Sequence, residues 1–164
     1  MYRNLPNLLS VLRLLMAPFV LVIPRSFLFP FLCFAGLTDI LDGFLARKLH
    51  AFSRLGAILD PLADKILALF CAYLFFTEGS LSPFSLVALF TRDLSVLIFT
   101  CYLFFSGKWS QWTIQSFFCG KVSTCLQIIV FSLLALTWDV PSFLYLALLG
   151  FGALSFLELL FLRA

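Results

Sequence analysis

Residues 39–64 read DILDGFLARKLHAFSRLGAILDPLAD and contain four carboxylates, Asp39, Asp42, Asp60 and Asp64, between apolar segments. These four are half of the eight acidic residues in the chain. An ionised side chain at membrane depth costs roughly 2.5–3.5 kcal/mol on insertion scales, and clustered carboxylates also repel one another. A divalent metal ion would neutralise such a cluster, so this segment is expected to carry the function.

The composition of the 164-residue chain argues against a water-soluble domain. Hydrophobic residues make up 63% of it and charged residues only 12%, whereas soluble domains carry about 25% charged residues. The mean hydropathy is +1.10. At roughly 20 residues per span, the length fits one domain, residues 1–164, an all-α integral membrane protein of six transmembrane helices. With a net charge of only +3, we expect no nucleic-acid partner.

Six apolar stretches, separated by short polar breaks, predict the helices. Their approximate bounds are 7–23, 27–47, 54–76, 82–105, 117–137 and 141–162. Pro18 lies inside the first stretch, where a kink is tolerated if neighbouring helices cover the freed carbonyl. Basic residues gather in the second break, at Arg47, Lys48 and Arg54, and in the fourth, at Lys108. Basic loops stay in the cytoplasm, so the second and fourth breaks are expected there. With six spans, the two termini then lie on the same side as these breaks, in the cytoplasm.

The two pairs of carboxylates are expected at similar depths. At 1.5 Å per residue, Asp42 and Asp39 lie about 7 and 12 Å before the end of the second span. Asp60 and Asp64 lie about 9 and 15 Å after the start of the third. Each pair has i,i+3 or i,i+4 spacing and therefore shares one helix face. The two antiparallel helices would form a pocket near the cytoplasmic face for one or two Mg²⁺ or Mn²⁺ ions, which prefer oxygen ligands.

Small residues accompany the acidic faces. Gly43 and Ala46 lie on the face of the first acidic pair, and Gly56 lies four residues before the second. Glycine inside a helix costs about 1 kcal/mol relative to alanine, so these residues indicate a slot for a bulky group close to the metal ions. Arg47 lies at the rim of that slot, where its guanidinium could grip a phosphate with two hydrogen bonds.

Together these residues form the pattern Asp39-x2-Asp42-Gly43-x2-Ala46-Arg47-x8-Gly56-x3-Asp60-x3-Asp64. The pattern resembles the signature of the CDP-alcohol phosphatidyltransferase family at every fixed position. Further segments resemble the family's phosphatidylglycerophosphate synthase branch and its cardiolipin synthase relatives, namely residues 4–10, Asp60-Pro61-Leu62-Ala63-Asp64-Lys65, Arg92-Asp93 and Lys121-x2-Thr124-x2-Gln127. The resemblance covers nearly the whole chain.

The resemblance implies a six-helix membrane fold, often a homodimer, with a polar cavity open to the cytoplasm. Family members transfer a phosphatidyl group from CDP-diacylglycerol to an alcohol and release CMP. Carried over by position, the four aspartates would hold two divalent ions, and Asp64 would also take the proton of the acceptor. The residues expected to bind CDP-diacylglycerol, from the resemblance and the slot together, are Pro6, Asn7, Gly43, Ala46, Arg47, Ser53 and Gly56.

The acceptor decides the product. Glycerol 3-phosphate carries a dianion and needs basic residues in the cavity, for which the candidates are Arg13, Arg92 and Lys121. The other interpretation of Arg92 is an internal ion pair, for example with an acid on another helix. We expect glycerol 3-phosphate as the acceptor and phosphatidylglycerophosphate as the product. The alternative is phosphatidylglycerol, the acceptor of cardiolipin synthases.

Two hypotheses come from other classes of protein. Acids inside a membrane often line ion paths, so the chain could be a cation or proton transporter. A transporter predicts acids distributed across the bilayer, whereas the four aspartates cluster toward one face. An inactive scaffold is the other hypothesis, and the intact pattern argues against it. The short chain without a transit-like segment suggests a bacterial inner membrane, with the active site facing the cytoplasm.

Overall fold

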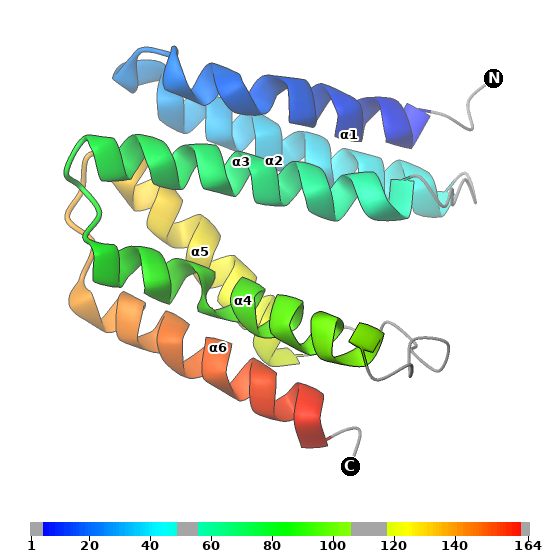
Figure 1. Cartoon of the computed structure of the whole chain (residues 1–164). Coiled ribbons are helices and arrows are strands. Elements are labelled where there is room, and N and C mark those ends of the chain that lie inside the picture. The colour runs from blue at the N-terminus through cyan, green and yellow to red at the C-terminus, as the bar shows by residue number, and fades with distance from the viewer. Residues whose placement is uncertain (1–4, 49–55, 106–117, 162–164) are drawn as a thin grey trace. The chain divides into compact units, whose positions relative to one another are not determined.

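The computed structural model describes residues 5–48, 56–105 and 118–161, and the side chains within 11–38, 62–99 and 119–158. All regular structure in these residues is helical, which confirms the predicted all-α fold. The elements are α1 (Leu5–Met16), the 3-10 helix η2 (Ala17–Leu21), α2 (Arg25–Lys48), α3 (Gly56–Thr77), α4 (Pro83–Phe105), α5 (Phe118–Ala135) and α6 (Ser142–Phe161) (Figure 1). The predicted stretches agree with α2 to α6 within two residues at each end.

The prediction of one helix over residues 7–23 is wrong, because α1 stops inside this stretch and η2 continues it. Pro18, at the start of η2, explains the change. Proline has no N–H to donate, and its ring clashes with the carbonyl four residues earlier, so the α-helical ladder cannot continue. The amides of Val22 and Ile23 both donate to the Phe19 carbonyl at 3.0 Å, which closes the turn before α2.

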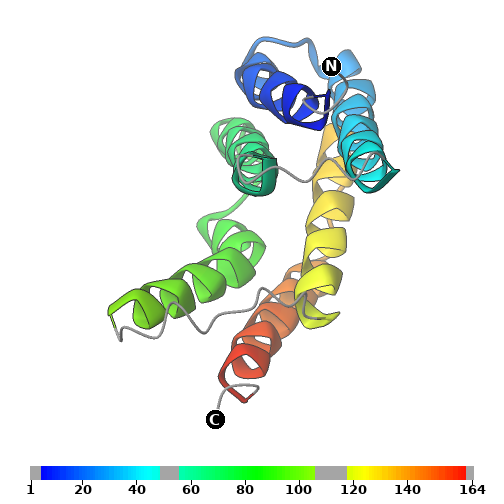
Figure 2. The ribbon, with the colours of Figure 1, turned by 90° about the vertical axis from the view of Figure 1, so that its right-hand side faces the viewer.

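The chain divides into two compact units, Met1–Ser80 and Leu81–Ala164. In the first unit α1 packs against both α2 and α3. The direction of colour in Figure 1 shows that α1 and α3 run the same way and that α2 runs opposite to them, and Figure 2 shows the three helices almost end-on. The buried apolar side chains of the first unit are mostly small, which lets its helices approach closely. They are Ala17, Val20, Leu28, Ala35, Ala63, Cys71, Ala72 and Phe75.

In the second unit α6 packs against both α4 and α5. The helices α4 and α6 approach closely at Gly152 on α6, where an added Cβ would lie 2.8 Å from Cγ2 of Thr91 and 3.1 Å from the backbone nitrogen of Arg92. The absence of a side chain at Gly152 therefore lets α6 lie directly on the backbone of α4. The buried apolar side chains of this unit are Leu81, Ala88, Leu89, Phe99, Val130, Phe131, Leu134, Ala135, Tyr145 and Leu148.

The helices α3 and α5 end in the same kind of turn. After α3, Gly79 has a φ of +76°, and its amide donates to the carbonyl three residues earlier at 3.0 Å. After α5, Thr137 has a φ of +59° and makes the same hydrogen bond at 3.0 Å. Glycine adopts this left-handed conformation without strain, whereas the β-branched side chain of threonine disfavours it. The second turn is therefore the more strained of the two.

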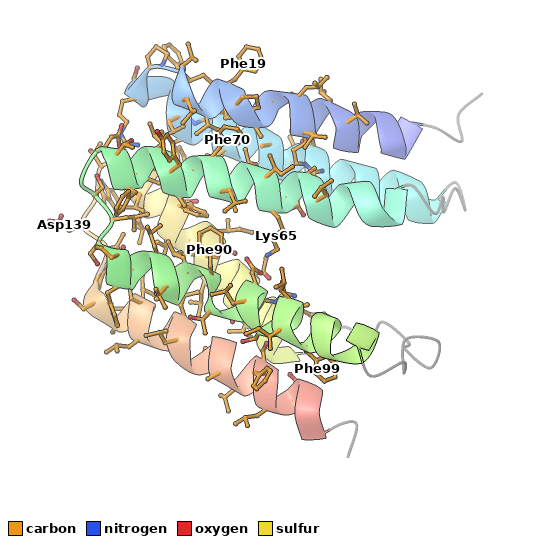
Figure 3. All side chains as sticks on the ribbon, viewed as in Figure 1. Phe19, Lys65, Phe70, Phe90, Phe99 and Asp139 are labelled. Atoms are coloured by element: carbon orange, nitrogen blue, oxygen red, sulfur yellow. The ribbon has the colours of Figure 1, made fainter. Side chains whose placement is uncertain are left out.

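Large apolar side chains lie on the outside of the described parts and several polar ones lie inside. The most exposed include Leu15, Phe19, Val22, Phe27, Phe143 and Leu146. Phe19 lies on the outer side of the first unit (Figure 3). The buried polar side chains are Arg13, Thr38, Ser85, Ser95, Ser123, Gln127 and Ser155. Within the described residues, no helix combines the length and the apolar content that crossing a membrane requires.

Candidate active site

An ion pair joins the start of α2 to the end of α3, the two helices on which α1 packs. Nη2 of Arg25 is 2.9 Å from Oε2 of Glu78. The same guanidinium lies 4.7 Å from the centre of the Phe75 ring, within the range of a cation–π interaction,. The first residue of α2 is therefore held beside the last turn of α3, and the two helices run antiparallel from this contact.

The four aspartate positions lie at similar distances from this contact along α2 and α3. At 1.5 Å per residue, Asp39 lies about 21 Å along α2 from the contact, and Asp64 lies about 21 Å along α3. On the same basis, Asp42 lies about 25 Å and Asp60 about 27 Å from it. All four positions therefore belong to the end of the first unit that is opposite to the ion pair.

The helix α1 contributes a buried arginine near this level. Nη1 of Arg13 donates a hydrogen bond to Oδ1 of Asp64 at 2.6 Å, although the two residues are 51 positions apart in the chain. The side chain of Arg13 is 1% exposed, and that of Asp64 is 48% exposed. A buried guanidinium requires a paired anion, so Arg13 binds Asp64 tightly. The carboxylate is thus held in one place while half of its surface can still reach a ligand.

Most other predicted site residues lie outside the described side chains, so their roles stay predictions. Those placed by their backbone alone are Asp39, Asp42, Gly43, Ala46 and Arg47 on α2, Gly56 and Asp60 on α3, and Pro6 and Asn7 on α1. Ser53 lies outside the described residues altogether.

The donor set predicted for this end of the first unit would suit a hard divalent cation. Carboxylate oxygens are the ligands that Mg²⁺ and Mn²⁺ prefer, and two helices carry two carboxylates each to the same level. The buried Arg13 adds one positive charge, which leaves the aspartates in excess. Among the described side chains, no three His, Cys, Asp or Glu residues come together. Of the four predicted metal ligands, only Asp64 has a described side chain.

The second unit carries the other two predicted acceptor-binding residues. The guanidinium of Arg92 extends from α4 to the start of α5, where an added Cβ on Gly120 would lie 3.4 Å from its Nε and Nη2. Lys121 follows Gly120 directly and is exposed. The guanidinium of Arg92 therefore reaches the turn of α5 that also carries Lys121. The internal ion pair predicted as the alternative for Arg92 is present, but with an acid of the same helix, because Nη1 of Arg92 lies 3.3 Å from Oδ1 of Asp93.

A buried polar group on α5 was not among the predicted site residues, although Gln127 belongs to a segment that resembles the family. Ser123 is 3% exposed and Gln127 is 7% exposed. Within the described part of the chain, Oγ of Ser123 and Nε2 of Gln127 have no hydrogen-bond partner. The signal was present in the sequence, because Gly120, Ser123 and Gln127 recur at three and four residues and so share one helix face. It could not be read without knowing which face of α5 is buried.

Comparisons with known proteins identify a family and several similar sequences. Residues 3–157 match the model of the family described as CDP-alcohol phosphatidyltransferase. The chain is 43% identical over 101 residues to the CDP-diacylglycerol–glycerol-3-phosphate 3-phosphatidyltransferase of Aquifex aeolicus, a match that covers 58% of this chain and 57% of the relative. It is 32% identical over 148 residues to the protein of the same name from Salmonella choleraesuis, covering 82% and 75%.

A second activity appears among the similar proteins. The chain is 33% identical over 173 residues to the cardiolipin synthase (CMP-forming) of Homo sapiens, covering 91% of this chain and 57% of the relative. The matches thus span little more than half the length of the relatives from Aquifex aeolicus and Homo sapiens.

Proposed function

Because the chain belongs to the CDP-alcohol phosphatidyltransferase family, we propose that it transfers a phosphatidyl group from CDP-diacylglycerol to glycerol 3-phosphate and releases CMP. The product would be phosphatidylglycerophosphate, an intermediate of phospholipid biosynthesis. The relatives from Aquifex aeolicus and Salmonella choleraesuis, both named for glycerol 3-phosphate, support this acceptor.

The observation that carries the proposal is the ion pair that joins the start of α2 to the end of α3. The contact of Arg25 with Glu78 brings two pairs of aspartate positions to one end of the first unit,. Asp39, Asp42, Asp60 and Asp64 would hold two Mg²⁺ or Mn²⁺ ions, which when bound would neutralise the charge of the diphosphate and of the leaving CMP. Phosphoryl transfer depends mainly on positioning and charge neutralisation, so this arrangement suits it.

In the proposed reaction Asp64 takes the proton from the acceptor hydroxyl. The hydroxyl oxygen forms a bond to the phosphorus of the phosphatidyl group, and the bond from that phosphorus to the oxygen shared with CMP breaks. CMP leaves with that oxygen and its electron pair. Arg13 orients the Asp64 carboxylate through their 2.6 Å hydrogen bond, which is charge-assisted and therefore strong,.

The substrate-binding residues in this proposal are those predicted from the sequence. The CDP group would bind along Gly43, Ala46, Arg47, Ser53 and Gly56, with Pro6 and Asn7 from the start of α1. The phosphate of the acceptor would bind Arg92 and Lys121, and the reach of the Arg92 guanidinium to the turn of α5 that carries Lys121 supports a shared role. For Arg13 the pairing with Asp64 favours a positioning role over direct acceptor binding.

The proposed location is a membrane, with the six helices as transmembrane spans and the site facing the cytoplasm of a bacterial cell. The 63% hydrophobic composition supports it. So do exposed apolar side chains such as Val22 and Phe143 around buried polar ones, since such surfaces are rare on soluble monomers,. The lipid nature of CDP-diacylglycerol also favours it. A homodimer, which the resemblance implies, stays a prediction.

A second candidate is a cardiolipin synthase, which would use phosphatidylglycerol as the acceptor. The match to the human enzyme over 91% of this chain supports it. The chemistry at Asp64 would be the same, and only the acceptor would differ. A cation or proton transporter is less well supported, because the family is defined by group transfer.

One assay separates these functions. The purified protein in detergent micelles receives CDP-diacylglycerol and Mg²⁺ with labelled glycerol 3-phosphate or phosphatidylglycerol, and CMP and the labelled lipid are measured. We expect glycerol 3-phosphate to support turnover, EDTA to stop it and Mg²⁺ or Mn²⁺ to restore it. Turnover with phosphatidylglycerol alone would identify a cardiolipin synthase. Ion flux across vesicles without CMP release would indicate a transporter.

A further inference from the structure

Hydroxyl groups on the helices of the second unit generally bond to their own helix. Thr91, Thr124 and Ser132 each donate to the carbonyl four residues earlier, at 2.6, 3.0 and 2.8 Å. Ser123 lies on the same helix as two of these and is 3% exposed, yet its Oγ has no hydrogen-bond partner within the described residues. A buried donor without an acceptor is unfavourable, so its position indicates that a bound molecule completes it.

Gln127 shows the same feature one turn further along α5. Its side chain is 7% exposed, and Nε2 has no hydrogen-bond partner in the described part of the chain. Long side chains on a helix lean toward its N-terminus, which brings the amide of Gln127 toward Ser123. Beyond Gln127 the buried face of α5 becomes apolar, with Val130 and Phe131. The polar part of this face is therefore confined to the first turns of the helix.

Arg92 lies at the beginning of this polar face. Its guanidinium contacts Gly120, and its Nε is buried without a hydrogen-bond partner among the described residues. Along α5, Ser123 lies about 4.5 Å and Gln127 about 10 Å from Gly120. One cationic donor is thus followed by two neutral ones. This order matches a small molecule with an anionic group at one end and hydroxyl oxygens beyond it.

We propose that Ser123 and Gln127 are specificity-determining residues that bind the hydroxyl oxygens of a phosphorylated polyol. The inference rests on the proposed function and assigns them the C2 hydroxyl of glycerol 3-phosphate, with the phosphate on Arg92. Gln127 donates from Nε2, and the Ser123 hydroxyl can both donate and accept, as recognition of an alcohol requires. A site of this kind rejects analogues without the hydroxyl, because its own polar groups are then left without partners.

The kinetic test compares Ser123→Ala and Gln127→Leu with Ser132→Ala. Ser132 is the matched control, because it lies on the same helix and its hydroxyl is already bonded to the Ile128 carbonyl. We expect the two test variants to raise KM for glycerol 3-phosphate about tenfold, the loss of roughly one hydrogen bond. Their KM for CDP-diacylglycerol should stay unchanged, and the control should match wild type. An unchanged KM for glycerol 3-phosphate in Gln127→Leu would overturn the proposal.

An acceptor analogue tests the assignment to the C2 hydroxyl. 3-Hydroxypropyl phosphate keeps the phosphate and the reacting hydroxyl of glycerol 3-phosphate but lacks the C2 hydroxyl. Wild type should prefer glycerol 3-phosphate in kcat/KM by about tenfold or more, and Gln127→Leu should lose most of that preference. If the variant keeps the wild-type preference, Gln127 does not read this hydroxyl.

Thermal unfolding in detergent distinguishes this role from a structural one and does not depend on turnover. Without ligand, Ser123→Ala and Gln127→Leu should unfold at the wild-type temperature or above it, because each removes a buried polar group that lacks a partner. Glycerol 3-phosphate should raise the unfolding temperature of wild type and Ser132→Ala, and less so that of the test variants. Equal stabilisation of all four proteins would overturn the proposal. If wild type binds the ligand in this way but produces no CMP, only the proposed transfer reaction fails.

Discussion

The two halves of the chain each pair an arginine with an aspartate, and they do so differently. In the first unit, Arg13 on α1 binds Asp64 on α3 at 2.6 Å, and its side chain is 1% exposed. In the second unit, Arg92 lies 3.3 Å from Asp93, the next residue of the same helix, and is 32% exposed. The first pair joins two helices, whereas the second joins two neighbours in the sequence.

The difference indicates different tasks for the two arginines. A guanidinium that is wholly buried and bound to a carboxylate of another helix fixes that carboxylate, so Arg13 serves to position Asp64. Arg92 is held loosely by Asp93, its Nε has no hydrogen-bond partner in the described part of the chain, and a third of its side chain is exposed. It therefore has donors to offer to an anionic ligand.

The largest effect should follow from removing the carboxylate of the first pair. Asp64→Asn should lower the rate of CMP release by about 10³-fold or more, because an amide can neither accept the proton nor bind a cation as a carboxylate does. The measurement is turnover with CDP-diacylglycerol and glycerol 3-phosphate at saturating Mg²⁺. Asp139→Asn, in the exposed turn after α5, is the control and should keep the wild-type rate. Near-normal turnover in Asp64→Asn would remove Asp64 from the mechanism.

Removing the carboxylate of the first pair should also destabilise the protein more than removing that of the second pair. Asp64→Asn should lower the free energy of unfolding by about 3 kcal/mol, because it removes the charge of the carboxylate that binds the buried guanidinium of Arg13 at 2.6 Å,. In Asp93→Asn, the loss of the 3.3 Å contact to Arg92 should account for about 1 kcal/mol or less, because a long contact to a partly exposed arginine contributes little,. Chemical unfolding in detergent gives both values. Equal losses would show that the two pairs are energetically alike, against the contrast drawn from their geometry.

Two glycines on α6 test how firmly Arg92 is placed. In Gly152→Ala the new Cβ would lie 3.1 Å from the backbone nitrogen of Arg92 and 2.8 Å from Cγ2 of Thr91. We expect a loss of about 1–3 kcal/mol as α4 and α6 separate, with a higher KM for the acceptor.

Gly150→Ala is the matched control, because an added Cβ there has no atom within 4 Å. It should gain up to about 1 kcal/mol from the better helix propensity of alanine. The unfolding temperatures of the two variants give the comparison directly. If both glycines tolerate alanine equally, the close approach of α6 to α4 does not constrain Arg92.

The smallest effect concerns the two similar helix ends. Thr137→Gly should raise the free energy of unfolding by about 1 kcal/mol, because glycine adopts the φ of +59° without strain,. Gly79→Ala, at the corresponding position of the first unit, should lower it by about 1 kcal/mol for the same reason. Thermal unfolding of both variants checks the pair of signs, and a loss of stability in Thr137→Gly would contradict the account of the turn.

Several features were predictable from the sequence because their causes are local. Apolar stretches of about 20 residues fixed the positions of α2 to α6, since a helix that long must be apolar to be buried or in contact with lipid. The aspartate positions were predicted at one level from the polar break between α2 and α3. The contact of Arg25 with Glu78 at the opposite end of these helices leads to the same conclusion. For Pro18 the sequence predicts a kink inside one helix, whereas in the structure α1 ends before it and a 3-10 helix follows.

By itself the sequence determined the all-helical fold, the family pattern and the levels of the acidic residues, because spacing along a helix follows from its constant rise and turn. Only the tertiary structure decided that Arg13 binds Asp64, that Arg92 lies against Gly120 and that the face of Ser123 and Gln127 is buried. Such contacts join residues that are distant in the chain. They depend on which faces of the helices pack together, which no local pattern specifies.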